Sequence, residues 1–170
     1  MTKSGWLAWK FRQNIVRDPF EKLLPGFGMN RDPERAPMRW DASRKAGFTT
    51  GEPWLPIGDD VARCNIRSQR KDPRSMLNLC RRLINLRRET PALRFGSFEP
   101  MREQGEVLLF ARRLAGQKVI AIKNLSPGPQ IVSLTNEARI MLSTALDRQE
   151  QLIGPTVWLR PDEGLLVQVS

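Results

Sequence analysis

Residues 31–56 read RDPERAPMRWDASRKAGFTTGEPWLP, and this stretch guides the interpretation of the whole chain. Its apolar residues follow neither the period of a helix nor that of a strand, and four of its residues are prolines. Because proline fixes φ and has no backbone N–H to donate, the stretch cannot be a regular helix or a central strand. It is too rich in large apolar groups for a solvated linker: Met38, Trp40, Phe48, Trp54 and Leu55. We therefore expect a long, ordered loop with a functional role.

The composition of the chain is that of a folded, water-soluble protein. Its 170 residues suffice for one ordinary domain or two small ones, and 40% of them are hydrophobic. No apolar run is long enough to span a membrane, and the N-terminus lacks the apolar core of a secretory signal. Cys64 and Cys80 have no metal-binding spacing, and we expect both to be reduced thiols in a cytoplasmic protein. We predict no cofactor and no metal.

The clearest regular element is a helix predicted for residues 72–89. Asp72 is a good N-cap and Pro73 suits the first helical position. An amphipathic stripe follows at helical spacing: Met76, Leu79, Cys80, Leu83 and Ile84. Arginines take the other side, and Pro91 cannot continue the helix. The apolar stripe requires a partner that the neighbouring sequence does not supply.

From about Phe98 the pattern changes to short strands. Residues 107–113 and 119–124 flank Gly116 and predict a hairpin. Further strands are expected at 130–134, 139–143, 155–159 and 164–169. Short strands separated by glycine and proline turns are typical of an antiparallel sandwich.

The loop also carries a family resemblance. Arg35-Ala36-Pro37-Met38-Arg39-Trp40-Asp41, followed by Ala46-Gly47-Phe48-Thr49, resembles the segment after the last barrel strand in exo-acting α-glucosidases of the α-amylase superfamily, such as oligo-1,6-glucosidases. The resemblance continues upstream through residues 17–22 and downstream through 71–75, 86–93, 121–126 and 159–164, and covers roughly Val16 to the end. Residues 1–15 do not follow the family pattern.

The resemblance implies an α+β fragment of a larger enzyme. Residues 1–97 would be the loop-rich tail of a (β/α)8 barrel with its last helix, and residues 98–170 an antiparallel β-sandwich C-terminal domain. A whole barrel needs about 250 residues, so this chain cannot contain one. The family reaction is hydrolysis of terminal α-glucosidic bonds with retention, which uses an Asp nucleophile, a Glu acid and a His-Asp motif. The resemblance places all three before this segment, and the sequence has no histidine. We name no catalytic residue and expect the chain alone to be inactive.

Binding is the role that the resemblance assigns to Arg35. In the family the matching arginine contacts the sugar near the scissile bond, and a guanidinium fork suits hydroxyl groups. Pairing with Asp32 or Glu34 is the structural alternative for Arg35. Arg39 replaces the family's glutamine and brings a cation next to this site. Trp40 and Phe48 could stack on a sugar, but packing inside the loop is the more common use of such residues.

Two other classes of function compete with the enzyme fragment. A non-catalytic module that binds carbohydrate or a partner chain would need no catalytic carboxylates. The net charge of +10 would also suit a nucleic-acid binder, but the basic residues are dispersed and no binding motif accompanies them. We predict an α-glucoside or oligosaccharide as ligand once the rest of the barrel is present, with that missing barrel portion as partner, and neither nucleic acid nor membrane.

Overall fold

The computed structural model describes residues 36–101 and 104–169. The chain divides into two compact units, Met1–Asp72 and Pro73–Ser170. Arg35 and residues 1–15, on which two of the sequence-based expectations fall, lie outside the described residues. Within the described ranges no helix is both long and apolar enough to cross a membrane.

The first unit, as far as it is described, is a loop that ends in one short helix, α4 (Ile66–Lys71). Asn65 caps this helix: its side chain accepts from the backbone N–H of Ser68, and the Ser68 side chain accepts from the N–H of Asn65. The irregular loop predicted for residues 31–56 is confirmed over its described part, residues 36–56, and the short helix α4 was not predicted.

The second unit begins with two helices. α5 (Met76–Glu89) starts later than predicted, because Ser75 and not Asp72 is its N-cap; Asp72 is instead the C-cap of α4. α6 (Pro91–Phe95) starts with a proline in its first turn, so Pro91 ends one helix and begins another. Most of the predicted apolar stripe of α5 is not buried: Leu79 is, whereas Met76 and Ile84 are 66% and 59% exposed.

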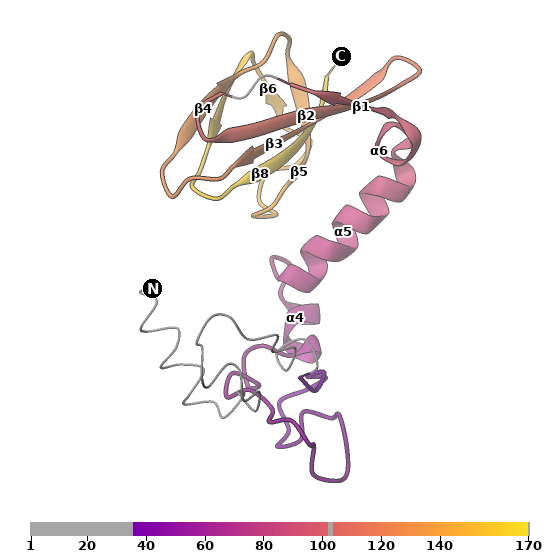
Figure 1. Ribbon diagram of the computed structural model, residues 1–170, viewed down its shortest axis with the longest axis vertical. Coiled ribbons are helices and arrows are strands. Elements are labelled where there is room, and N and C mark those ends of the chain that lie inside the picture. Colours follow the sequence, from indigo (N-terminus) through magenta and orange to yellow (C-terminus); the bar gives the residue numbers. More distant parts are fainter. Residues whose placement is uncertain (1–35, 102–103, 170) are drawn as a thin grey trace, which may run out of the picture. The chain divides into compact units, whose positions relative to one another are not determined.

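Eight strands follow and form two antiparallel sheets (Figure 1). They are β1 (Ser97–Pro100), β2 (Val107–Leu114), β3 (Gln117–Asn124), β4 (Gln130–Ser133), β5 (Ala138–Ser143), β6 (Leu152–Ile153), β7 (Thr156–Leu159) and β8 (Gly164–Val169). The larger sheet has the order β1-β2-β3-β8-β5-β6, and β4 pairs with β7 in the smaller one. The predicted hairpin is present: β2 pairs with β3 across Ala115 and Gly116, both of which have positive φ.

The two sheets share one hydrophobic core. Alternate residues of each strand point into it, as the burial of Val107, Leu109 and Ala111 along β2 shows. The smaller sheet contributes Val132, Val157 and Leu159 to the same cluster. The second compact unit begins before the strands, because α6 contacts β2 and β3. The boundary predicted between residues 97 and 98 is of another kind: it separates the barrel tail from the β-sandwich domain of a complete enzyme.

Candidate functional site

The loop that carried the sequence argument is closed by a tight turn. The backbone N–H groups of Trp40 and Asp41 both donate to the carbonyl oxygen of Ala46, at 2.8 and 3.2 Å. Ala46 and Gly47 have φ values of 52° and 64°. A side chain on Gly47 would lie 3.1 Å from an oxygen of Asp41, so glycine suits this position both by conformation and by space. The Ala46-Gly47 pair of the sequence motif is therefore what allows the loop to turn back on Trp40.

Asp41 serves this turn through its carboxylate. The Ser43 N–H donates to Asp41 Oδ1 at 3.0 Å, and Arg67 Nη2 lies 3.7 Å from Oδ2. Hydrogen bonds from Ser43, helped by the charge of Arg67, hold the pKa of Asp41 below its ordinary value. A carboxylate kept ionised in this way is a poor proton donor.

Arg39 is paired with Asp60. Its Nη1 contacts Asp60 Oδ1, and the two side chains are 28% and 48% exposed. The carbonyl oxygens of Arg39 and Trp40 accept from the N–H groups of Ile66 and Arg67, at 2.9 and 3.1 Å, which fixes the loop to the start of α4. The cation that replaces the family's glutamine is thus neutralised within the loop.

Large apolar side chains of the loop are exposed. Trp40 and Phe48 are 49% and 48% exposed, and Met38 and Trp54 are 48% and 65% exposed. Packing inside the loop, the use expected for Trp40 and Phe48, is therefore only half realised. The turn around Ala46 is closed by backbone hydrogen bonds, which order the chain without burying the Trp40 and Phe48 rings.

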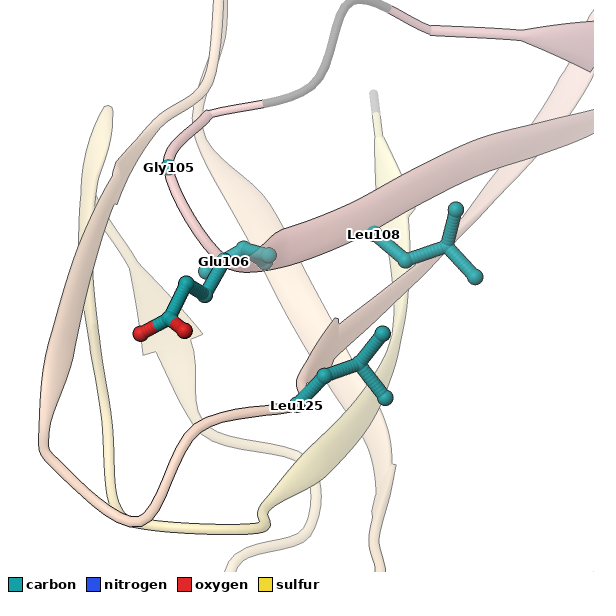
Figure 2. A pocket seen from close by; sticks show the side chains of 5 residues that line it. Gly105, Glu106, Leu108 and Leu125 are labelled. Atoms are coloured by element: carbon teal, nitrogen blue, oxygen red, sulfur yellow. The ribbon is translucent and has the colours of Figure 1, made fainter.

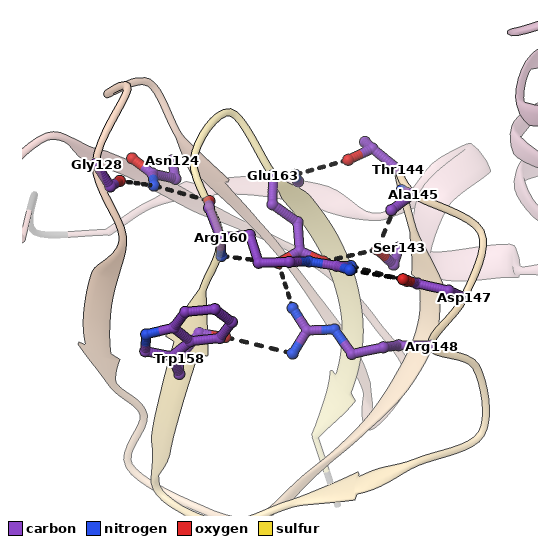
Figure 3. A network of polar contacts seen from close by, with 11 residues as sticks. Asn124, Gly128, Ser143, Thr144, Ala145, Asp147, Arg148, Trp158, Arg160 and Glu163 are labelled. Carbon is purple, nitrogen blue, oxygen red and sulfur yellow. Dashed lines mark hydrogen bonds and ion pairs between the residues drawn. The ribbon is translucent and has the colours of Figure 1, made fainter.

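A second polar cluster lies at the end of the large sheet and centres on Glu163, which is 3% exposed (Figure 3). Its Oε1 accepts from Ser143 Oγ at 2.8 Å and from Arg160 Nη2 at 2.5 Å. Its Oε2 accepts from the Arg160 N–H at 3.0 Å and from Arg148 Nη2. Arg160 also pairs with Asp147, at 2.6 and 2.7 Å.

The electrostatics of this cluster indicate a structural role. Burial alone would raise the pKa of Glu163, but hydrogen bonds from Arg160, Arg148 and Ser143 outweigh it and lower the pKa to about 2. Both carboxylate oxygens are occupied by donors, so the group can neither give up a proton near neutrality nor attack a substrate. Residues 159–164 carry part of the family resemblance, but the sequence does not predict that Glu163 is buried.

A pocket of about 320 Å³ opens where β2 begins (Figure 2). It is lined by Gly105, Glu106, Val107, Leu108 and Leu125. Among the described residues that line it, Glu106 is the one that carries a charge, so these residues do not include the pair of carboxyl groups that glycoside hydrolysis requires. Across residues 36–101 and 104–169 no group of His, Cys, Asp or Glu side chains is placed to hold a metal ion.

Comparison with known proteins agrees with the sequence motif. The family model of the α-amylase catalytic domain matches residues 8–96. The chain therefore belongs to the α-amylase family. Among its relatives is the oligo-1,6-glucosidase of Parageobacillus thermoglucosidasius, 27% identical over 89% of this chain and 28% of the relative. The trehalose-6-phosphate hydrolase of Escherichia coli is 34% identical over 67% of this chain and 21% of its own length.

Solved structures lead to the same family. The trehalulose synthase of Pseudomonas mesoacidophila superposes with a TM-score of 0.75 at 28% identity, over 83% of this chain and 26% of the synthase. Variants of that synthase were solved with isomaltulose and with the substrate sucrose. The resemblance to oligo-1,6-glucosidases is thus confirmed, and this chain spans between about a fifth and three tenths of the length of these relatives.

Proposed function

We propose that this chain is the C-terminal part of an α-glucosidase-type glycoside hydrolase. In the complete enzyme the reaction would be hydrolysis of terminal α-glucosidic bonds with retention, and the substrate an α-glucoside or oligosaccharide. The observation that carries the proposal is the family match: it runs from residue 8 to residue 96, through the Pro37-to-Phe48 loop, yet the chain covers only 28% of the oligo-1,6-glucosidase.

In this proposal residues 1–97 are the tail of the catalytic barrel and residues 98–170 are the β-sandwich domain. The exposed stripe of α5 supports the first assignment, because Met76 and Ile84 lack apolar cover. The shared core of the two sheets supports the second. The protein would act in the cytoplasm, in keeping with its two free, exposed cysteines.

The chain alone would be inactive. Hydrolysis with retention needs a nucleophile and an acid on opposite sides of the bond. Among the described carboxylates considered above, Asp41 closes a turn and Glu163 is enclosed by donors. Arg35 would contribute to sugar binding only where the rest of the barrel completes the site.

The test is an assay of the purified 170-residue chain with p-nitrophenyl α-glucoside, with an intact oligo-1,6-glucosidase as positive control. We expect no release of p-nitrophenol above the blank. Clear turnover that is lost in an Arg35→Ala variant would overturn the proposal of inactivity and place a working site in this chain. The DNA immediately upstream of the gene gives a second test: we expect it to encode a barrel with the catalytic Asp, Glu and His-Asp pair.

The exposed side chains of Met38, Trp40, Phe48 and Trp54 favour a second candidate, a non-catalytic module that binds carbohydrate or a partner chain. Aromatic faces can stack on sugar rings. Titration calorimetry with maltose and isomaltose separates this candidate from the first. A carbohydrate-binding module gives saturable heat that a Trp40→Ala variant loses, whereas an incomplete glucosidase site gives none.

A further inference from the structure

A pocket of about 300 Å³ lies between the helices and the large sheet of the second unit. α5 and α6 each contribute to it, and so do β2 and β8; Figure 1 shows α6 beside the end of β2. Its lining residues are Leu83, Arg87, Leu93, Phe110, Arg112 and Leu166. None of the functional assignments above uses this pocket.

The pocket is on the face of the sheet opposite to the shared core. Residues alternate between the two faces along a strand, and Leu109 and Ala111 point into the core, so Phe110 and Arg112 point away from it. By the same rule Leu166 lies between two core residues of β8 and faces the pocket. Four of the six lining side chains are apolar, which gives the pocket a largely hydrophobic wall.

Arg112 is the unusual member of this wall. Its Nε is buried and has no hydrogen-bond partner. The neighbouring Arg113, by contrast, donates from its Nε to Glu99 at 2.7 Å. A guanidinium is always charged, and leaving one of its donors buried without an acceptor is unfavourable. Arg87 adds a second guanidinium, and none of the lining residues is acidic.

We propose that this pocket binds an organic carboxylate that has an apolar tail. Arg112 and Arg87 bind the carboxylate, since a guanidinium fork matches its two oxygens. Leu83, Leu93, Phe110 and Leu166 enclose the tail. At about 30 Å³ per water, the volume corresponds to about ten waters, which is close to the size of an eight-carbon acid such as octanoate.

The experiment is a titration of the full chain, with its leucine methyl groups isotopically labelled, followed by NMR. Leu83, Leu93 and Leu166 place one reporter on each of α5, α6 and β8. We expect octanoate to shift these three methyl signals saturably, with a Kd on the order of 1 mM for a ligand of this size. Acetate, which has the head group alone, and 1-octanol, which has the tail alone, should each bind at least about tenfold more weakly.

Variants locate the anion site. Arg112→Gln should weaken octanoate binding about tenfold or more, because a charge-assisted hydrogen bond is lost. Arg113→Gln is the matched control: it removes the same charge one residue away, where Glu99 is the partner, and should leave Kd within about twofold. Arg87 lines the pocket but is itself exposed, so Arg87→Gln should fold and should also weaken octanoate binding, which tests the proposal even if the Arg112 variant fails to fold.

Several results would overturn the proposal. One is the absence of saturable methyl shifts with octanoate. Another is equal affinity for octanoate and 1-octanol, which would mean an apolar cavity without an anion site. Equal affinity for octanoate and acetate, or equal weakening by Arg112→Gln and Arg113→Gln, would mean general attraction to a basic surface. None of these results bears on the α-glucosidase assignment, which depends on different residues.

Discussion

The loop of residues 36–65 and the strands of residues 97–169 use the same kinds of apolar residue in opposite ways. In the strands one face is hidden: Ile140, Leu159 and Val167 are 0% exposed. In the loop most large apolar side chains remain in contact with solvent: Trp54 is 65% exposed, and Leu55, at 1%, is the exception. The period of two directs alternate strand residues toward a common core, whereas the loop has no period that would turn its apolar groups to one side.

The order of the loop instead comes from short polar contacts. The turn at Ala46 and the cap at Asn65 join residues that are close in the sequence, and the Arg39–Asp60 pair joins two that are 21 positions apart. Such contacts fix a backbone without covering large side chains. The difference teaches that the strands bury a core of their own, while the loop is ordered with most of its large apolar side chains exposed.

The largest effect is expected in the shared core. Ile140→Ala removes a fully buried side chain and should lower the free energy of unfolding by about 4 kcal/mol. Urea unfolding followed by far-ultraviolet circular dichroism measures it. Ile131 is the matched control: it is in β4 but 65% exposed, and Ile131→Ala should cost less than about 1 kcal/mol. Equal losses would mean that the two sheets do not share a core in solution.

The second effect concerns the buried carboxylate. Glu163→Gln keeps the shape but removes the charge that faces Arg148 and Arg160, and should cost about 3 kcal/mol at neutral pH. Because the folded protein holds the pKa of Glu163 at about 2, below the ordinary 4.5, the native residue stabilises fully above 4.5 and loses this contribution as pH falls toward 2. Urea midpoints of both proteins should therefore converge in acid.

A constant difference between the two proteins from neutral to acid pH would contradict this prediction, because the contribution of Glu163 would then not depend on its ionisation. Some acid sensitivity should remain in the Gln variant, since the hydrogen bond from Arg160 also lowers the pKa of Asp147. Ser143→Ala, which deletes one neutral donor to Glu163, should cost less than the charge removal.

A smaller and more local effect is expected in the loop. Arg39→Gln restores the residue typical of the family and removes the pairing with Asp60; both side chains are partly exposed, so the cost should be about 0.5 kcal/mol. A double-mutant cycle with Asp60→Asn isolates the pair. A coupling free energy above about 2 kcal/mol between Arg39 and Asp60 would mean that this pair stabilises the loop strongly, which would contradict the expected difference between loop and core.

The smallest effect should come from the exposed aromatics. Trp40→Ser and Phe48→Ser should change the urea midpoint by an amount equivalent to no more than about 0.5 kcal/mol, since half of each side chain is already in water. Trp158, 52% exposed on β7, allows the same test within the β unit. A large loss of stability in the Trp40 variant alone would show that the Trp40 ring packs against other residues in solution.

The strands could be predicted from the sequence because their signal is local. Alternation and the Gly116 turn located the β2–β3 hairpin, and the remaining long strands were expected within one or two residues of where they lie. β1 was not predicted because it ends in Pro100, a residue that is unfavourable in strands. β6 was not predicted because its two residues are too few to show an alternating pattern. The start of α5 was misplaced because Asp72 and Ser75 are both good N-caps, and only the structure shows that Asp72 ends α4.

Less of the candidate site could be predicted from the sequence. The loop motif identified the family, but local sequence cannot say that Arg39 would find Asp60, 21 positions away, or that Trp40 would remain uncovered. Nor does the Arg112-Arg113 pair in a strand pattern reveal that Arg112 would face a pocket made with two helices. These features depend on which segments meet, and the role of Arg35 stays a prediction for the complete enzyme.

Amide hydrogen exchange of the full chain tests most directly the contrast between the strands, which share a buried core, and the loop, which is held by polar contacts. We predict that amides paired between β2, β3 and β8 exchange only on global unfolding. The amides of Trp40 and Ala46, although hydrogen-bonded, should exchange at least about a hundredfold faster, through local opening. Loop amides protected as strongly as those of the strands would contradict the account, because the loop would then be stable without the rest of a barrel.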